Sequence, residues 1–392
     1  MSGAVVGPLR VGAVAHGGHC VARHEGRVVF VRHSLPGELV DVRITDTGHE
    51  RYWRGDAVTV HEASPDRTEP PCPVSGPGRC GGCDLQHVAL PAQRRLKAEV
   101  VAEQLQRLAG LAVDVEVEPV PGDEEGLAWR TRMRYHADTD GVLGLRHHRS
   151  HDLEPVPVGG CPISDPRGRP DRTGWEPGQV VETAVDTAGS VSTLVDGERV
   201  SGPALLHQRV GDQELAVAAD GFWQVHPGAA ETLVEAVLEG LAPQRGERAF
   251  DLYCGVGLFA VALTRLGVRV WGVESSRSAV AHARRNLATA GDTASRVTAG
   301  RVAQVLRRLP ERTDLVVLDP PRTGAGGEVV RAVLARRPRR VAYVACDPAA
   351  LARDLRTALD AGWRLTSLRA FDLFPMTHHV ECVALLEPGS GV

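Results

Sequence analysis

A cysteine and a glutamate in the C-terminal part of the chain could together carry out covalent chemistry. Cys346 follows an apolar run at residues 340–345 and precedes an expected helix, and Glu381 opens the apolar run at residues 381–386. A helix N-terminus lowers the pKa of a nearby thiol toward that of a reactive thiolate, and an opposing carboxylate can accept a proton. Taken alone, Cys346 would be interpreted as a small buried residue, so the hypothesis depends on its surroundings.

A glycine turn upstream indicates a site for a nucleotide-like ligand. Residues 250–260 read Phe-Asp-Leu-Tyr-Cys-Gly-Val-Gly-Leu-Phe-Ala. This is the pattern of a strand, a tight turn that lets the backbone approach a ligand at Gly255, and a helix with free N–H groups. Glu274 ends the next apolar run, and an acid about 20 positions past the glycines suits a ribose diol. The third glycine of the dinucleotide pattern is missing, and an ordinary tight turn is the alternative interpretation.

A further strand end carries another candidate site residue. Residues 315–318 are apolar and run into an Asp-Pro-Pro-Arg sequence that begins at Asp319. Alternating strands and helices over this part of the chain predict a parallel sheet. Because ligands bind such sheets at the carboxyl ends of the strands, we expect Asp319 to face the same site as Cys346 and Glu381.

Four further cysteines could hold a metal. Cys72, Cys80 and Cys83 lie on one proline- and glycine-rich loop with the spacing C-x7-C-G-G-C, and Cys161 is the best candidate for a fourth ligand. Four thiolates suit zinc and also a [4Fe–4S] cluster, and the spacing does not separate the two. Free buried cysteines are the weaker alternative for such a group.

The elements that must position these residues fall into three predicted domains. Residues 1–62 carry short β-type runs between glycine turns, typical of a five-stranded OB-like barrel, with a structural β-cap as the alternative. Residues 63–240 contain the cysteine loop and a central β-rich domain, and residues 241–392 form an α/β, doubly wound, Rossmann-like domain. The expected barrel strands are residues 9–14, 27–31, 39–44 and 56–60.

Basic residues cluster at two places in the central segment. An apolar stripe predicts a helix over residues 91–108, whose basic residues are assigned to its solvated face: Arg94, Arg95 and Lys97. Farther on, alternation places three guanidinium groups on one strand face, which could bind phosphates or simply be solvated. These are Arg130, Arg132 and Arg134.

The composition and charge of the chain limit its expected partners and cellular location. The chain has 392 residues and a formal net charge of −4, so any nucleic-acid site must be a local basic patch. No apolar stretch is long enough to span a bilayer, and the N-terminus lacks a basic region followed by an apolar one. We therefore expect a cytoplasmic protein with no membrane partner, and a monomer.

Together these motifs resemble the RNA uracil-C5 methyltransferase family, class I S-adenosylmethionine-dependent enzymes that modify uridine in tRNA and ribosomal RNA. The resemblance covers nearly the whole chain. Residues 17–18, 26–31 and 35–38 are similar to the RNA-binding TRAM barrel. The other matching motifs are the CGGC loop with the Asp-Leu-Gln-His that follows it, Phe-Trp-Gln-Val, the glycine turn, Asp-Pro-Pro-Arg, Cys-Asp-Pro and the closing Phe-Pro…His-Val-Glu.

The resemblance implies a role for each candidate residue. Cys346 would be the nucleophile that adds to C6 of the uracil, and Glu381 the base that removes the C5 proton. The expected methyl-donor contacts are Gln224, Tyr253, Gly255, Glu274 and Asp319. The implied [4Fe–4S] ligands are Cys72, Cys80, Cys83 and Cys161, with zinc as the alternative. The implied partner is RNA, with ribosomal RNA favoured over tRNA because tRNA-specific members generally lack the barrel and the cluster.

Three positions depart from the family pattern. His226 stands where asparagine is usual, Leu258 where a polar residue often touches the donor, and Asp347 where asparagine commonly follows the nucleophile. Two rival functions also remain open at this stage. One is an NAD-dependent oxidoreductase, which the missing third glycine disfavours, and the other is a non-catalytic RNA-binding protein on a methyltransferase scaffold.

Overall fold

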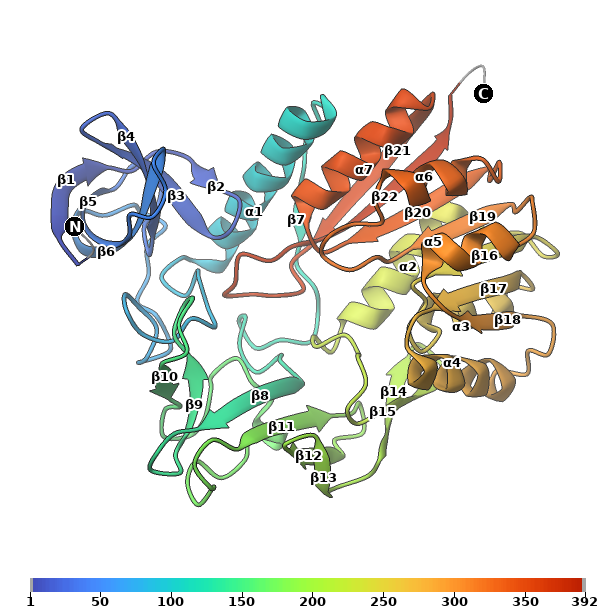
Figure 1. The fold of residues 1–392 in the computed structure, drawn as a ribbon, viewed down its shortest axis with the longest axis horizontal. Helices are drawn as coiled ribbons and strands as arrows, with labels where there is room; N and C mark the ends of the chain where they lie inside the picture. Colours follow the sequence, from blue (N-terminus) through green and yellow to red (C-terminus); the bar gives the residue numbers. More distant parts are fainter. Residues whose placement is uncertain (1–2, 390–392) are drawn as a thin grey trace.

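One eight-stranded sheet organises the C-terminal part of the chain in the computed structural model, which describes residues 3–389 (Figure 1). The strand order is β18-β17-β16-β19-β20-β22-β21-β7. In chain order the strands are β7 (Val117–Glu118), β16 (Arg248–Leu252), β17 (Arg269–Glu274), β18 (Arg296–Ala299), β19 (Leu315–Leu318), β20 (Arg340–Ala345), β21 (Trp363–Phe371) and β22 (Glu381–Pro388). The helices beside them are α2 (Ala229–Leu241), α3 (Leu258–Arg265), α4 (Arg277–Thr289), α5 (Val302–Val305), α6 (Gly327–Leu334) and α7 (Pro348–Asp360). The expected α/β, doubly wound, Rossmann-like architecture is confirmed.

The prediction of a wholly parallel sheet is wrong at one strand. β22 runs antiparallel to both of its neighbours, β20 and β21. The connection from β21 to β22 consists of residues 372–380 and contains no helix. A parallel return needs a crossover of about a dozen residues or more, so this shorter connection reverses the strand.

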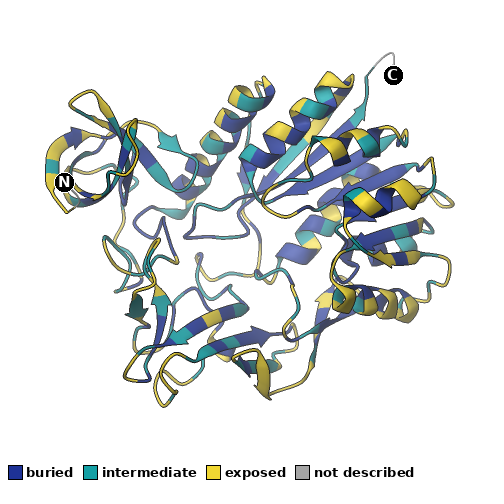
Figure 2. Ribbon diagram, in the orientation of Figure 1, coloured by how far each residue is buried: buried dark blue, intermediate teal, exposed yellow. Residues whose placement is uncertain are grey.

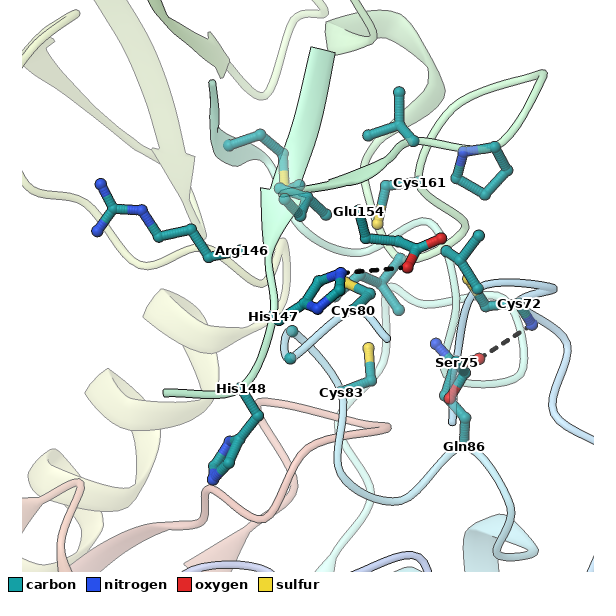
Figure 3. Close-up of a pocket in the computed structure, with 18 of the residues that line it drawn as sticks. Cys72, Ser75, Cys80, Cys83, Gln86, Arg146, His147, His148, Glu154 and Cys161 are labelled. Carbon is teal, nitrogen blue, oxygen red and sulfur yellow. Dashed lines mark hydrogen bonds and ion pairs between the residues drawn. The ribbon is translucent and has the colours of Figure 1, made fainter. Parts of the chain in front are cut away.

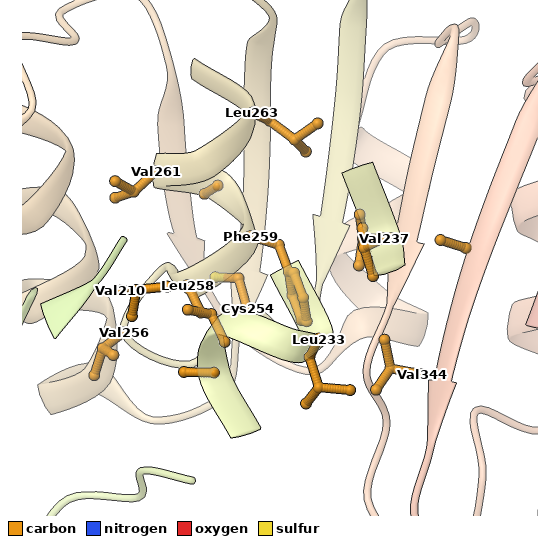
Figure 4. Close-up of a cluster of buried hydrophobic side chains, with 14 of the residues drawn as sticks. Val210, Leu233, Val237, Cys254, Val256, Leu258, Phe259, Val261, Leu263 and Val344 are labelled. Atoms are coloured by element: carbon orange, nitrogen blue, oxygen red, sulfur yellow. The ribbon is translucent and has the colours of Figure 1, made fainter. Parts of the chain in front are cut away.

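Helices cover both faces of this sheet, and its central strands are buried (Figure 2). Alternate residues of β19 belong to different apolar clusters: Leu315 and Val317 to one, Val316 and Leu318 to the other. Figure 4 shows the first cluster, where side chains of α2 and α3 pack beside the glycine turn. The two layers hold the carboxyl ends of the strands in fixed positions.

The N-terminal unit is a barrel of six strands rather than the expected five. Its order is β1-β5-β6-β4-β3-β2. The Gly12 N–H donates a hydrogen bond to the Val21 carbonyl of β3, the Val21 N–H donates one to the Ala13 carbonyl, and these bonds help to close the barrel. The bounds are β1 (Val5–Arg10), β2 (Val14–Ala15), β3 (His19–His24), β4 (Arg27–Arg32), β5 (Leu39–Asp46) and β6 (Tyr52–Glu62). The expected strand at residues 9–14 is divided between β1 and β2. β3 was missed because its polar residues conceal its alternation.

The central segment is β-rich, as predicted. Six antiparallel strands pair in the order β10-β9-β8-β11-β12-β13, and β14 and β15 form a separate hairpin. The bounds are β8 (Arg132–Ala137), β9 (Leu143–Arg146), β10 (Leu153–Pro155), β11 (Val180–Val185), β12 (Val191–Val195), β13 (Glu198–Ser201), β14 (Leu205–Val210) and β15 (Gln213–Ala218). In Figure 1 this sheet lies below the C-terminal sheet and the barrel.

The predicted helix over residues 91–108 is present as α1 (Leu90–Gln104), followed by a π-helical turn over Leu105–Ala109. One assignment on it is wrong. Lys97 is buried rather than solvated, and its ammonium group lies 2.6 Å from the Asp372 carboxylate in the connection between β21 and β22. A buried cation requires such a partner, so this pair ties α1 to the connection that leads to Glu381.

The limits of 62/63 and 240/241 between the three domains stay a prediction. Helix α2, which ends the central segment in that division, packs on β20 and β22 of the C-terminal sheet. Among residues 3–389 no helix is both long enough and apolar enough to cross a bilayer.

Candidate active site and cysteine cavity

All seven expected catalytic and donor-binding residues line one cavity of about 940 Å³ at the carboxyl ends of the parallel strands. They are Gln224, Tyr253, Gly255, Glu274, Asp319, Cys346 and Glu381. Tyr253, Glu274, Asp319 and Cys346 lie at or just after the carboxyl ends of parallel strands, where ligand sites of doubly wound sheets are found. Glu381 instead opens the antiparallel strand β22, and Gln224 comes from the segment between β15 and α2. Residues from distant parts of the sequence therefore share one solvent-accessible space.

The glycine turn and Glu274 form one end of this cavity. The Glu274 carboxylate accepts hydrogen bonds from the backbone N–H of Gly255 at 3.2 Å and of Ser276 at 2.7 Å. Gly255 has a φ of +53°, and a Cβ atom there would meet nothing within 4 Å. The turn is thus held by the acid expected to bind a diol, and its backbone is open to a ligand.

Two further acids lie at this end of the sheet: Asp251 is buried, and the half-buried Asp319 lines the cavity. Burial raises the pKa of Asp319 to about 7, and the neighbouring Glu274 adds to the shift. Burial, with Asp319 as the next cause, raises the pKa of Asp251 to about 8. A positively charged ligand would relieve the repulsion among these carboxyl groups. The acidic lining therefore fits a ligand that combines a cationic centre with a ribose.

The candidate nucleophile, Cys346, and the candidate base, Glu381, are set opposite each other by strand pairing. In the β20–β22 ladder Ala345 pairs with Cys382, and one further step along the same register brings Cys346 opposite Glu381. Cys346 is half-buried, whereas the Glu381 side chain is buried. Burial, followed by the charge of Asp319, raises the pKa of Glu381 well above its usual value.

The expectation that a helix end lowers the pKa of Cys346 is wrong for the ligand-free protein. Burial and then the Glu381 carboxylate raise this pKa to about 12. The N-terminus of α7 is occupied, because the Asp347 side chain accepts a hydrogen bond from the Ala350 N–H at 2.7 Å. Without ligand, Cys346 is therefore a neutral thiol at neutral pH, and ionisation requires added positive charge in the cavity.

Arg322 and His379 also line this cavity with Cys346 and Glu381, although neither was selected as a site residue in advance. The Arg322 guanidinium lowers the pKa of Cys346 and of Glu381, against the larger effect of burial. It lies 3.1 Å from Nε2 of His379. Burial and the charge of His378 lower the pKa of His379 to about 3, so its ring is neutral and can accept this hydrogen bond. The available signal was Arg322's place in the Asp-Pro-Pro-Arg motif.

Asp354 of α7 fixes the loop that follows Arg322. Its carboxylate accepts hydrogen bonds from the Ala325 N–H at 2.8 Å, the Gly326 N–H at 3.1 Å and the Tyr343 hydroxyl at 2.5 Å. A Cβ atom at Gly324 would lie 2.7 Å from an Asp354 carboxylate oxygen. The loop that follows Arg322 is therefore packed tightly against α7, the helix that begins beside Cys346.

A second cavity, of about 350 Å³, brings the four predicted metal ligands together (Figure 3). Cys72, Cys80 and Cys83 reach it from their loop, and Cys161 reaches it from the segment between β10 and β11. Burial raises the pKa of each of these thiols, and that of Cys80 to about 11. Within the described part of the chain, no three His, Cys, Asp or Glu side chains are grouped closely enough to hold a metal ion.

The expected arginine face is only partly available for phosphates. Arg132 turns inward and donates hydrogen bonds to the backbone carbonyls of Ala219 at 2.9 Å and Gly221 at 2.7 Å. Arg134 is exposed and pairs with Glu182 at 3.0 Å. Arg130 and Arg134 both line the cysteine cavity, so the surface that could meet RNA lies beside the four thiols.

Two of the three departures from the family pattern have a structural account here. His226 is buried, its Nδ1 accepts a hydrogen bond from the Gly228 N–H at 3.2 Å, and its ring stacks with Trp129. Leu258 also lines the first cavity, but most of its side chain is buried in the cluster of Figure 4. The Leu258 side chain therefore contributes apolar wall and no hydrogen bond.

The barrel contacts the loops on both sides of the active site. Arg32 of β4 donates a hydrogen bond to Asp84 at 3.1 Å, and Asp84 in turn lies 2.5 Å from Nδ1 of His378. On the other side, Nε2 of His16 lies 3.1 Å from the Asp347 carboxylate. These contacts join the barrel to the loop before Glu381 and to the residue after Cys346.

The fold and this donor cavity define a class I S-adenosylmethionine-dependent methyltransferase. Residues 208–388 match the family described as tRNA (Uracil-5-)-methyltransferase, and residues 6–58 match the TRAM domain. The chain belongs to the RNA uracil-C5 methyltransferase family and is an RNA (uracil-C5)-methyltransferase.

The similar proteins span almost the full length of the chain. A Streptomyces avermitilis protein described as an "Uncharacterized RNA methyltransferase" is 49% identical, over 97% of this chain and 98% of its own. The Shewanella amazonensis 23S rRNA (uracil(1939)-C(5))-methyltransferase RlmD is 32% identical, over 96% of this chain and 95% of its own. The crystal structure of Pyrococcus abyssi tRNA (uracil-54, C5)-methyltransferase with S-adenosyl-L-homocysteine is similar in fold, with a TM-score of 0.73, 23% identity, and coverage of 97% and 99%.

Proposed function

We propose that this enzyme methylates C5 of a uridine in ribosomal RNA through a covalent adduct on Cys346, with Glu381 as the base. The observation that supports this most directly is the pairing of β20 with β22, which sets Cys346 opposite Glu381 in the cavity that also contains the donor-site residues. An oxidoreductase would not need a thiol and a carboxylate facing each other there, and a non-catalytic RNA-binding protein would need neither.

The two residues meet the demands of the chemistry. The Cys346 thiolate adds to C6 of the uracil, and the electrons of the C5–C6 double bond move toward C5 and the O4 carbonyl. C5 then takes the methyl group of S-adenosylmethionine, and the electrons of the methyl–sulfur bond leave with S-adenosylhomocysteine. Glu381 removes the C5 proton, the electrons of the C–H bond re-form the double bond, and Cys346 leaves as a thiolate.

Because Cys346 is neutral in the ligand-free enzyme, donor binding and ionisation of the thiol have an order. The thiol has a pKa of about 12 without ligand, and Arg322 is the cation of the chain that favours its ionisation. The sulfonium of the methyl donor supplies a second positive charge when bound. We therefore propose that the nucleophile ionises after the donor has bound, which protects it from reaction in the empty enzyme.

We propose that the methyl donor binds to the residues expected from the sequence. We assign the ribose diol to Glu274 and the close backbone approach to Gly255, and Asp319 lines the same cavity. Gln224 and Tyr253 contribute further polar groups to its lining. The target base must leave its stack to reach Cys346, as bases do for other enzymes that modify them.

Mapping of uridine methylation by mass spectrometry tests both the activity and the RNA class. We expect cells without the gene to lose one 5-methyluridine from ribosomal RNA, and the wild-type gene to restore it. A gene encoding Cys346→Ala should not restore it. Loss of a tRNA 5-methyluridine instead would reject the ribosomal target but keep the chemistry, and loss of no methylated uridine would reject the proposed function.

We also propose that Cys72, Cys80, Cys83 and Cys161 bind a [4Fe–4S] cluster. The four thiols share one cavity, yet no three of these side chains form a group that would hold a single ion. Zinc requires its sulfurs to converge at about 2.3 Å from one atom, whereas a cluster distributes its thiolates over four irons. Cys161 would thereby fasten the cysteine loop to the central domain. Because one chain supplies the whole site, we propose that the enzyme acts as a monomer. We also propose that it acts in the cytoplasm.

Iron analysis tests the cluster. Protein purified without oxygen should be brown and contain about four irons per chain, and Cys161→Ser should lose most of the iron. Cys20→Ser is the matched control, because Cys20 is a buried free cysteine of the barrel and its substitution should leave the iron content unchanged. Colourless wild-type protein with one zinc per chain would reject the iron assignment but retain the site.

A further inference from the structure

A contact between the barrel and the nucleophile's neighbour is not explained by RNA binding. His16, in the turn between β2 and β3, places Nε2 3.1 Å from a carboxylate oxygen of Asp347. The other oxygen of Asp347 accepts the Ala350 N–H at the start of α7. Asp347 is thus held from two sides, by the helix and by the barrel, and it directly follows Cys346.

The same turn of the barrel is pressed against the loop that leads to the base. A Cβ atom at Gly18 would lie 2.9 Å from Cβ of His378 and 3.0 Å from Cβ of Asp84. Arg32 of the barrel also pairs with Asp84, with both side chains largely buried. These contacts with His378 and Asp84 hold the turn that carries His16 in place. His16 therefore cannot easily move with Asp347 if the loop that carries Cys346 shifts.

Asp347 also suits this contact better than the asparagine common in the family. A carboxylate offers one acceptor to the helix and a second to an imidazole N–H. An asparagine whose oxygen accepts the helix N–H could meet the histidine only as a donor, through its amide NH2 group, and without a negative charge. The aspartate at this position and the histidine on the barrel are therefore complementary, although they lie far apart in the sequence.

We propose that His16 is a positioning residue that holds Asp347, and through it the Cys346 loop, in the reactive arrangement. This inference rests on the proposed role of Cys346. It makes the barrel part of the catalytic framework in addition to any contact with RNA. A chain without the His16–Asp347 contact should bind RNA and methyl donor but form the covalent bond more slowly.

The test is a single-turnover measurement of covalent capture of RNA that carries 5-fluorouridine at the target, with enzyme and donor in saturating excess. We expect His16→Ala to slow adduct formation by roughly five- to ten-fold, the effect of losing one ordinary, partly exposed side-chain hydrogen bond. The dissociation constants for RNA and for donor should change by less than about two-fold. His16→Gln, whose amide can still donate to Asp347, should recover most of the rate.

A second histidine–aspartate pair in the barrel is a close control. Nε2 of His61 lies 2.9 Å from Asp41, and the side-chain exposures of 41% and 26% resemble the 38% and 23% of His16 and Asp347. Both members of the control pair belong to the barrel, so His61→Ala should leave the adduct rate unchanged.

Three results would overturn the inference. They are an unchanged adduct rate in His16→Ala, a weaker RNA affinity with a normal rate at saturation, and an equal loss in His61→Ala. The first would show that the contact is dispensable, the second that His16 binds RNA, and the third that any change in the barrel slows the enzyme. Failure of the wild-type enzyme to form an adduct at all would instead contradict the proposed function.

Discussion

Cys346→Ala is expected to abolish both methylation and covalent capture of RNA, a loss on the order of 10⁴-fold or more, because the other thiol that lines the cavity, Cys254, is buried beside the glycine turn. Binding of the methyl donor should persist, since Glu274 and the glycine turn are untouched. The measurement is a denaturing gel with radiolabelled donor and 5-fluorouridine RNA. Fluorine cannot leave C5 as a cation, so the wild-type adduct remains visible.

Cys20→Ala is the control for this substitution, because Cys20 is buried in the barrel with its thiol hydrogen-bonded to the Ser34 carbonyl oxygen. This variant should retain the adduct. A labelled protein–RNA band from Cys346→Ala would show that another residue is the nucleophile. Loss of donor binding in Cys346→Ala would mean that the substitution disturbed the whole cavity, and Cys346→Ser would then be the informative variant.

Glu381→Gln is expected to trap the enzyme after methyl transfer with ordinary, unfluorinated RNA. Attack and methyl transfer do not require the base, whereas release of the thiolate does. Loss of a general base typically slows a reaction by about 10²- to 10⁴-fold, so a methylated protein–RNA adduct should accumulate. Because burial favours the uncharged form of Glu381, the neutral amide should fit the site with little loss of stability.

Glu387→Gln is the matched control, since Glu387 lies on the same strand but pairs with Arg340 and Arg364 at its far end. Its turnover should be close to that of the wild type. If Glu381→Gln binds RNA and donor normally but gives no labelled adduct, Glu381 acts before methyl transfer. If turnover is normal, another group is the base, with Asp319 the nearest candidate by charge.

Much of the C-terminal fold followed from local patterns. The expected strands that lead to Tyr253, Glu274 and Asp319 agree within a residue or two with the observed β16, β17 and β19, because strands buried on both faces have distinctive sequences. The same strand ends then identified the cavity residues. This worked because ligand sites of doubly wound sheets lie where such strands end.

The errors arose where tertiary contacts overrode local pattern. Lys97 was assigned to solvent because its partner, Asp372, is remote in the sequence. The pKa of Cys346 was expected to be low from the adjoining helix, but burial and then the opposing Glu381 raise it instead. The contact of His16 with Asp347 left no local signal. Pairings of this kind depend on how separate units dock, which periodicity does not encode.

The position of β22 has a consequence for how the enzyme becomes active during synthesis. β22 follows every other strand of the sheet in chain order, yet it lies between β20 and β21 rather than at an edge. Until residues 381–388 emerge from the ribosome, β20 and β21 have no partner on their facing edges, and open edges of this kind invite aggregation. The strand that completes the sheet also delivers Glu381, so the nascent chain gains its proposed base only when its central sheet closes.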